Sequence, residues 1–156
     1  MAIFTPTVGI ITDIAAQSGC ALLFTVQSED QGLITVLLPS DAYVLGARPF
    51  EVGDRATFFY SPGAPAPLIF PPRYRALAAA YTPKGKNAYL DYFNGRLVNS
   101  DGTLILNLSG AQRPKTANGQ PFYGDPAGMY LLITYGATTR SIPAQTTPDQ
   151  IVVFCK

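Results

Sequence analysis

Turn-forming residues interrupt this chain about every eight to twelve residues, a spacing that leaves room for short strands but not for long helices. The stretches between the turns favour strands, as Leu33 to Leu38 does with its β-branched and aliphatic residues. The clearest turn signals are Asp101-Gly102 and Asn118-Gly119. The pattern therefore predicts an all-β protein of the sandwich or barrel type.

We expect about ten short strands. The alanine-rich range 74–81 fits either two turns of helix or a buried strand, because a short apolar run has no readable period. Five prolines fall between Pro62 and Pro72, and they predict an extended segment outside any central strand, since proline has no amide hydrogen. The expected strands cover residues 7–14, 20–27, 33–38, 43–45, 56–60, 88–98, 103–108, 129–135 and 151–154.

The range 82–87 is polar and turn-prone, and it divides the chain into residues 1–82 and 83–156. In the first part, a strand is followed by a hairpin of 20–28 with 33–38, by a Val-Gly-Asp turn at 52–54 and by further strands. This order resembles an OB-type barrel, although the helix usual between the third and fourth strands is missing. The resemblance implies an OB-like barrel at 1–82. We expect 83–156 to form a second antiparallel β layer packed on it.

Three further strings resemble a group of uncharacterised small proteins from spore-forming bacteria. They lie at 67–74, 92–102 and 139–148, and together they cover about a fifth of the chain. No activity comes with this resemblance. It implies a setting, a spore former, rather than a mechanism.

The charge pattern points away from nucleic acid and from membranes. Eleven basic and ten acidic residues give a net charge of +1, which is too small to steer the chain toward an anionic partner. The sequence has no run of about 18 apolar residues, so we expect no membrane-spanning helix. No basic residue precedes Arg48, so we expect synthesis in the cytoplasm without a signal peptide, with release to a spore or cell surface after lysis.

Several classes of catalysis are excluded by composition. The chain has no histidine, which removes Ser-His-Asp and Cys-His nucleophilic sites and histidine-ligated metal sites within one chain. The ten carboxylates lie mostly at turns, where aspartate hydrogen-bonds to the backbone. We therefore expect no enzyme, no metal and no cofactor, and a carboxylate-based hydrolase is kept only as a third reading.

Cys20 and Cys155 are the only cysteines, and they lie near opposite ends of the chain. Three readings stay open: two reduced and partly buried thiols, disulfides between subunits, or one bridge within the chain. The spacing does not choose among them. The reading that bears on function is the inter-subunit disulfide.

The apolar surface of this chain is larger than one domain of this size can bury. The chain has nine tyrosines and nine phenylalanines, whereas only 13% of its residues are charged. We therefore expect exposed apolar patches and a homopolymer, a fibre or coat subunit joined through strand edges and extended segments. The segments expected to reach a neighbour are Met1–Pro6, Pro62–Pro72, Thr138–Pro148 and Ile151–Lys156.

A second hypothesis is a monomeric OB-type module that binds single-stranded nucleic acid or a small ligand. Cations interleaved with aromatic rings are typical of single-strand binders. The near-neutral charge disfavours a nucleic acid, because phosphate contacts supply most of that affinity. The candidate face consists of Phe58, Tyr60, Arg73, Tyr74 and Arg75.

Overall fold

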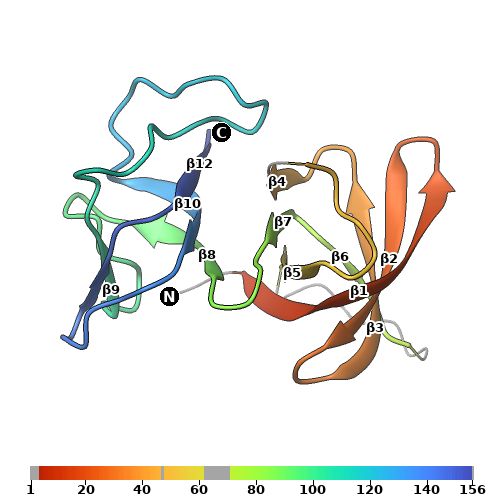
Figure 1. Ribbon diagram of the computed structural model, residues 1–156. Helices are drawn as coiled ribbons and strands as arrows, with labels where there is room; N and C mark the ends of the chain where they lie inside the picture. Colours follow the sequence, from red (N-terminus) through yellow and green to blue (C-terminus); the bar gives the residue numbers. More distant parts are fainter. Residues whose placement is uncertain (1–3, 47, 62–70, 156) are drawn as a thin grey trace. The chain divides into compact units, whose positions relative to one another are not determined.

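The computed structural model describes residues 4–46, 48–61 and 71–155, which form twelve strands and no helix (Figure 1). The all-β prediction is confirmed. The chain divides into two compact units, one spanning Phe4–Lys84 and the other beginning at Gly85. This division falls within the polar range 82–87.

The first unit holds one seven-stranded sheet, in the order β4-β7-β5-β1-β2-β3-β6. No sheet of the described residues closes into a barrel through its strand pairings, so the expected OB-like barrel is not confirmed. The strands of this unit are β1 (Thr5–Ser18), β2 (Ala21–Ser28), β3 (Gly32–Pro39), β4 (Tyr43–Leu45), β5 (Arg55–Tyr60), β6 (Arg73–Arg75) and β7 (Ala78–Tyr81).

The alanine-rich range that fitted helix or strand forms β6 and β7. The three alanines from Ala78 to Ala80 are completely buried between β4 and β5. Their partners lie far away in the sequence, and small side chains allow β7 to fit between two neighbouring strands. Tertiary pairing therefore decides a structure that local propensity leaves open.

β1 is the longest strand, and it changes partners along its length. Its first half pairs with β5 from Thr5 to Ile10, and its second half pairs with β2 from Gly9 to Ser18. Gly9 lies in both pairings, and a Cβ added there would collide with the backbone of Gln27 and lie 2.8 Å from Cα of Ser28. Only glycine fits this crossing point without movement of β2.

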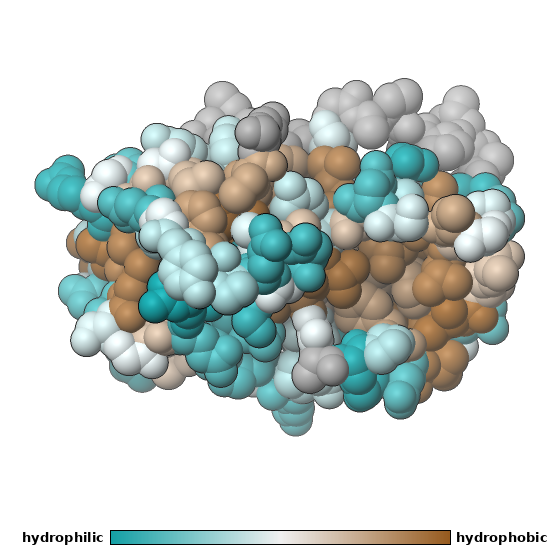
Figure 2. All heavy atoms as spheres, turned by 90° about the horizontal axis from the view of Figure 1, so that it is seen from above, coloured by the Kyte–Doolittle hydropathy of each residue, from teal (hydrophilic) through white to brown (hydrophobic). Residues whose placement is uncertain are grey.

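The surface retains the apolar side chains that the composition predicts. Figure 2 shows hydrophobic residues gathered in broad areas of one face of the molecule. Large exposed side chains occur in both units; among the described residues they are Ile10, Leu22, Val44, Val52, Leu77, Tyr92, Tyr123 and Ile142. Contiguous apolar areas of this kind are typical of interaction surfaces.

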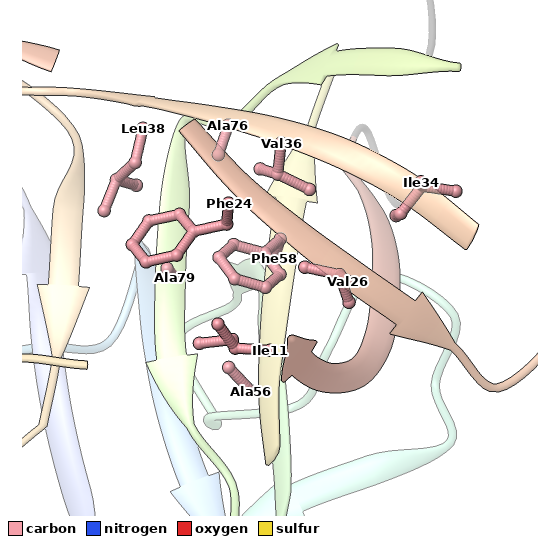
Figure 3. Packing of buried hydrophobic residues seen from close by; sticks show 10 residues of the cluster. All are labelled: Ile11, Phe24, Val26, Ile34, Val36, Leu38, Ala56, Phe58, Ala76 and Ala79. Carbon is pink, nitrogen blue, oxygen red and sulfur yellow. The ribbon is translucent and has the colours of Figure 1, made fainter. Parts of the chain in front are cut away.

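The core of the first unit lies on one face of its curved sheet (Figure 3). Phe24, Phe50 and Phe58 contact one another, with ring centroids 5.7 to 6.2 Å apart. Alternate residues of β2 and β3 point into this core, as a strand with one buried face requires. The cluster contains Ile11, Phe24, Val26, Ile34, Val36, Leu38, Ala56, Phe58, Ala76 and Ala79.

The second unit has a three-stranded antiparallel sheet, β12-β10-β8, and a parallel pair, β11-β9. Its core contains Phe93, Leu104, Leu106, Leu131, Ile133, Ile151 and Val153. The strands are β8 (Asn87–Phe93), β9 (Leu104–Leu106), β10 (Met129–Tyr135), β11 (Ala144–Thr146) and β12 (Gln150–Phe154).

The strand expected at 88–98 ends at Phe93 instead. The side-chain oxygen of Asn94 accepts hydrogen bonds from the amides of Arg96 and Val98. This local bonding replaces the sheet ladder with a turn, and Leu97 adopts a φ of 61° within it.

Candidate interaction surface

The five residues of the predicted ligand face do not share one surface. Phe58 is fully buried in the core of the first unit, where a ligand has no access. Tyr60 and Tyr74 stack on each other, with centroids 4.6 Å apart and planes inclined by 17°. Arg73 and Arg75 are exposed, and they flank Tyr74 along β6.

The hydroxyls of the tyrosine pair already have partners within the chain. Tyr74 donates a hydrogen bond of 2.8 Å to the side-chain oxygen of Gln31, and the Tyr60 hydroxyl lies 3.0 Å from that of Thr7. Burial raises the pKa of Tyr74, and the charge of nearby Asp30 adds to the rise. Tyr60 and Tyr74 therefore help to join β1, β5 and β6 rather than forming an open stacking platform.

The two arginines lie on the other side of β6. Arg73 pairs with Thr35 and Arg75 with Leu37 of β3, so both guanidinium groups lie on the outer face of the sheet. The structure thus brings together the cationic part of the predicted face. The aromatic part lies on the inner face.

Both cysteines are free and exposed. Cys20 lies in the two-residue turn between β1 and β2, and Cys155 follows β12 in the other unit. Figure 1 shows the β1–β2 turn projecting from the first unit. Both thiols are therefore accessible to other molecules.

The second half of β1 has an edge that no described strand covers, and the sequence pattern did not reveal it. Ile11 still bonds across this edge, because its amide donates to Asp54 O and its carbonyl accepts from the Gly53 amide. Beyond Thr12, no strand of the described residues pairs with that side of β1. Within the described ranges, residues 13–18, which we call the β1 edge, therefore have a partner strand on one side only.

The pairing of the neighbouring strands tells which backbone groups of the β1 edge point outward. Thr35 donates its amide to Pro72 O, and Leu37 accepts from Ala76, so these two residues of β3 bond toward β6. Val36 then bonds toward Phe24, which leaves Leu23 and Thr25 to bond toward β1. By the same alternation, Ile14 and Ala16 turn their amides and carbonyls away from β2.

The side chains of the β1 edge offer little protection against strand addition. Asp13 is the only charged residue in the range 13–18, which contains no lysine and no proline. Ala15 to Ser18 are exposed. Ala16 lies opposite the half-exposed Leu22, so the apolar inner face of the hairpin continues past the buried core.

The outer strands of the second unit are covered in part by their own loops. On β12, the Lys115 amide donates to Ile151 O and the Val153 amide donates to Lys115 O, at 3.0 and 2.8 Å. On β8, the Tyr92 amide donates to a carboxylate oxygen of the preceding residue, Asp91. These contacts occupy backbone groups that would otherwise bind another strand.

Asp91 is fully buried and organises the turn after β8. Its carboxylate accepts hydrogen bonds from the amide and hydroxyl of Ser100, at 3.1 and 2.6 Å, and from the Tyr89 hydroxyl at 3.2 Å. Burial raises the pKa of Tyr89 to about 12. Each of these donors is fixed by the fold, so the cluster is a structural network.

A polar hollow of about 440 Å³ lies in the second unit. Lys86 and Asp149 form an ion pair of 2.9 Å at its wall. Every buried side-chain nitrogen and oxygen of the described residues has a hydrogen-bond partner, so none is left aimed into the hollow. Its other lining residues are Asn107, Gly136, Ala137, Thr138, Thr139, Gln145, Thr146 and Thr147.

The part of the chain that the structure describes contains no group of three residues suited to hold a metal ion. In the same ranges, no helix has the length and hydrophobicity to cross a membrane. Comparisons with protein-family models, with curated proteins and with solved structures found no match to this chain.

The four segments expected to reach a neighbour are placed only in part. Residues 1–3, 62–70 and 156, which belong to three of them, lie outside the described residues. Thr5 and Pro6 pair with β5, and 151–154 belong to β12. Thr138–Pro148 carries β11 and the exposed Ile142, whose side chain is 92% accessible.

Proposed function

We propose that this chain is a non-enzymatic structural protein that associates with copies of itself, as a subunit of a fibre or coat layer. The observation that carries this proposal is the β1 edge, a strand margin of low charge that no described strand covers and that lies beside exposed apolar residues. Backbone groups at such a margin bind a further strand and supply affinity without any dedicated side-chain site.

The exposed apolar residues support the same function. They occur in both units, from Leu22 and Val44 in the first to Tyr123 and Ile142 in the second. A subunit of an extended assembly needs contact surfaces at more than one place, because each copy must touch at least two others.

Sedimentation velocity over a range of protein concentrations, followed by negative-stain electron microscopy, tests the proposal. We expect species larger than the monomer, with a share that grows with concentration. A single monomeric species at every concentration, with and without reductant, would overturn the proposal.

We further propose that Cys20 and Cys155 link assembled copies by disulfides once the protein meets an oxidising exterior. Their exposure supports this role. In non-reducing electrophoresis of oxidised assemblies, the ladder of covalent oligomers is expected to stop at dimers for Cys20→Ser and for Cys155→Ser. A ladder unchanged in both variants would contradict the proposal.

A monomeric binding module is the second candidate function, and the exposed pair Arg73 and Arg75 on the outer face of β3 and β6 favours it. Binding to a single-stranded oligonucleotide would then weaken steeply with salt, and Arg73→Ala with Arg75→Ala would abolish it. The absence of binding at low salt would remove this candidate.

We also infer that the strands of Phe4–Lys84 follow an OB-like order. Support comes from the meander β1-β2-β3, from the antiparallel pair β1-β5, and from the segment that carries β6 and β7. Within this segment, the Ala76 amide donates to Leu37 O of β3 and the Leu77 amide to Phe59 O of β5. Slow hydrogen exchange at both amides is expected, and fast exchange at either one would contradict it.

We propose that the protein lies at the surface of a spore or of its parent cell. This proposal is based on the resemblance to proteins of spore-forming bacteria. Immunogold labelling of sporulating cultures tests it. Label confined to the cytoplasm of growing cells would overturn it.

A further inference from the structure

We propose that two copies of this chain join through their β1 edges in an antiparallel pair around a two-fold axis, with Ala15 facing Ala15 of the second copy. This inference rests on the proposed self-association and names one surface that carries it. The pairing would join the β1-β2-β3 strands of both copies into one continuous sheet.

The register follows from the backbone groups that point outward. Ile14 and Ala16 present their amides and carbonyls to the open side, whereas Asp13 and Ala15 use theirs toward β2. The antiparallel arrangement that uses both outward residues of both copies places Ile14 opposite Ala16 of the second copy. Ala15 then lies on the two-fold axis.

The side chains are compatible with this register. The small Ala15 residues meet at the centre, where facing Cα atoms of a non-hydrogen-bonded pair are only about 4.5 Å apart. Asp13 lies opposite Gln17 of the second copy. The two Asp13 residues are then separated by about four residues, or roughly 14 Å, which exceeds the screening length of about 8 Å at physiological salt.

The pairing also covers apolar surface. Ala16 lies opposite Leu22 on one face of the hairpin, and the same face carries Ile14, which packs against the core. Ile14 of the second copy would lie opposite Ala16 and extend this row by one strand. The row would bring aliphatic side chains together that the single chain leaves at the margin of its core.

A two-fold contact of this kind closes on itself and yields a dimer. Growth into a fibre or layer then needs a second surface elsewhere on the chain. The dimer is therefore the expected building block of the assembly. The β1 contact within it does not repeat along a fibre or layer.

Cysteine cross-linking tests the register directly, in a background that carries Cys20→Ser and Cys155→Ser. Ala15→Cys is expected to give a covalent dimer on mild oxidation, because facing residues of this pair have the Cα separation of a disulfide. Gln17→Cys is the matched control, since position 17 would lie about 14 Å from its own copy and form little dimer. Equal cross-linking of the two variants, or none from Ala15→Cys, would overturn the register.

A proline substitution tests the edge itself. Ala16→Pro removes an outward amide that has no partner within the hairpin, so the hairpin should still form. It should raise the dissociation constant of the dimer about tenfold or more, because both copies lose a donor. Ala16→Ser keeps the amide and should associate as the unchanged chain does.

A distance measurement separates failure of this inference from failure of the proposed function. In Cys155→Ser, spin labels on Cys20 of two paired copies should lie roughly 34 Å apart, about ten residues along the joined strands. Association without this distance, and without an effect of Ala16→Pro, would overturn the β1 pairing and leave self-association standing. A chain that stays monomeric would overturn both.

Discussion

The two units of this chain treat the margins of their sheets differently. In the second unit, Lys115 bonds to the outer side of β12, and the Asp91 carboxylate holds the outward amide of Tyr92 on β8. In the first unit, the far half of β1 has no such cover among the described residues. The lesson is that one chain can protect some strand edges with its own loops and leave another available to a partner.

The largest effect is expected in the first unit, at the crossing point of β1. Gly9→Ala should destabilise that unit by at least about 3 kcal/mol, because the new methyl group would overlap the backbone of β2. Hydrogen exchange followed by mass spectrometry reports the stability of each unit separately. Gly19→Ala, at a position with no atom within 4 Å of the new Cβ, should change little.

A loss from Gly9→Ala as small as that from Gly19→Ala would show that β2 can move away from Gly9 at little cost in stability. A loss in both units after Gly9→Ala would show that they unfold as one. Either result would show that the two units cannot be compared as separately stable parts of the chain.

The next effect concerns the covered edge of the second unit. Asp91→Ala should destabilise it by about 2 to 3 kcal/mol, because the amides of Tyr92 and Ser100 lose their acceptor inside the protein. Urea unfolding measures this loss. Asp101→Ala, at an exposed turn position, is the control and should fall within about 0.5 kcal/mol of the unchanged chain.

Asp91→Ala also sharpens the comparison of edges. Without the Asp91 carboxylate, the Tyr92 amide can bond to another strand, so β8 should become a second edge open to strand addition. Light scattering should then detect faster aggregation than for Asp101→Ala. An aggregation rate unchanged after Asp91→Ala would show that this cap does not guard the edge.

A smaller effect is expected from the Asp54 carboxylate in the first unit. Arg48 binds it through two nitrogens at 3.0 Å, and this pairing holds the pKa of Asp54 below its usual value of 3.8. Since the folded-state pKa is depressed, the stabilisation is present above about pH 4 and is lost as the pH falls through the folded-state pKa. Asp54→Asn should therefore cost on the order of 1 kcal/mol at neutral pH and progressively less in acid.

Urea unfolding from neutral pH to pH 2.5 or so checks this dependence. A difference between Asp54→Asn and the unchanged chain that stays constant in acid would contradict the role of the carboxylate charge. Asp41→Asn, at an exposed turn, serves as the control.

The smallest effect is expected at the ion pair of the second unit. Lys86 and Asp149 are both nearly half exposed, and water screens their attraction. Lys86→Met should change stability by about 0.5 kcal/mol or less in thermal unfolding. A loss of stability as large as that of Asp91→Ala would mean that the Lys86–Asp149 ion pair is essential to the fold of the second unit.

Local patterns predicted the strands well where the partner is close in sequence. The alternation of Leu22, Phe24 and Val26 gave the inner face of β2, and the hairpin to β3 follows from the polar turn between them. Pairing between strands that are distant in the sequence could not be predicted from local patterns. The range 74–81 becomes strand through contacts with β3, β4 and β5, which no short window contains.

The candidate surface was predictable only in its chemistry. Low charge and many aromatic residues indicated self-association, but the β1 edge appears only once β1 has been seen to change partners at Gly9. Phe58 illustrates the limit on single residues. Its neighbours in sequence suggested a ligand face, whereas the pleat of β5 turns it into the core.

The divided pairing of β1 also bears on the order of folding. Its second half meets β2 through a two-residue turn, whereas its first half must wait for β5, which the ribosome delivers some forty residues later. During that interval the side of β1 that later pairs with β5 has no partner strand. Other growing chains could then pair with β1 in place of β5, so low expression and fast synthesis of residues 19–60 should favour correctly folded subunits.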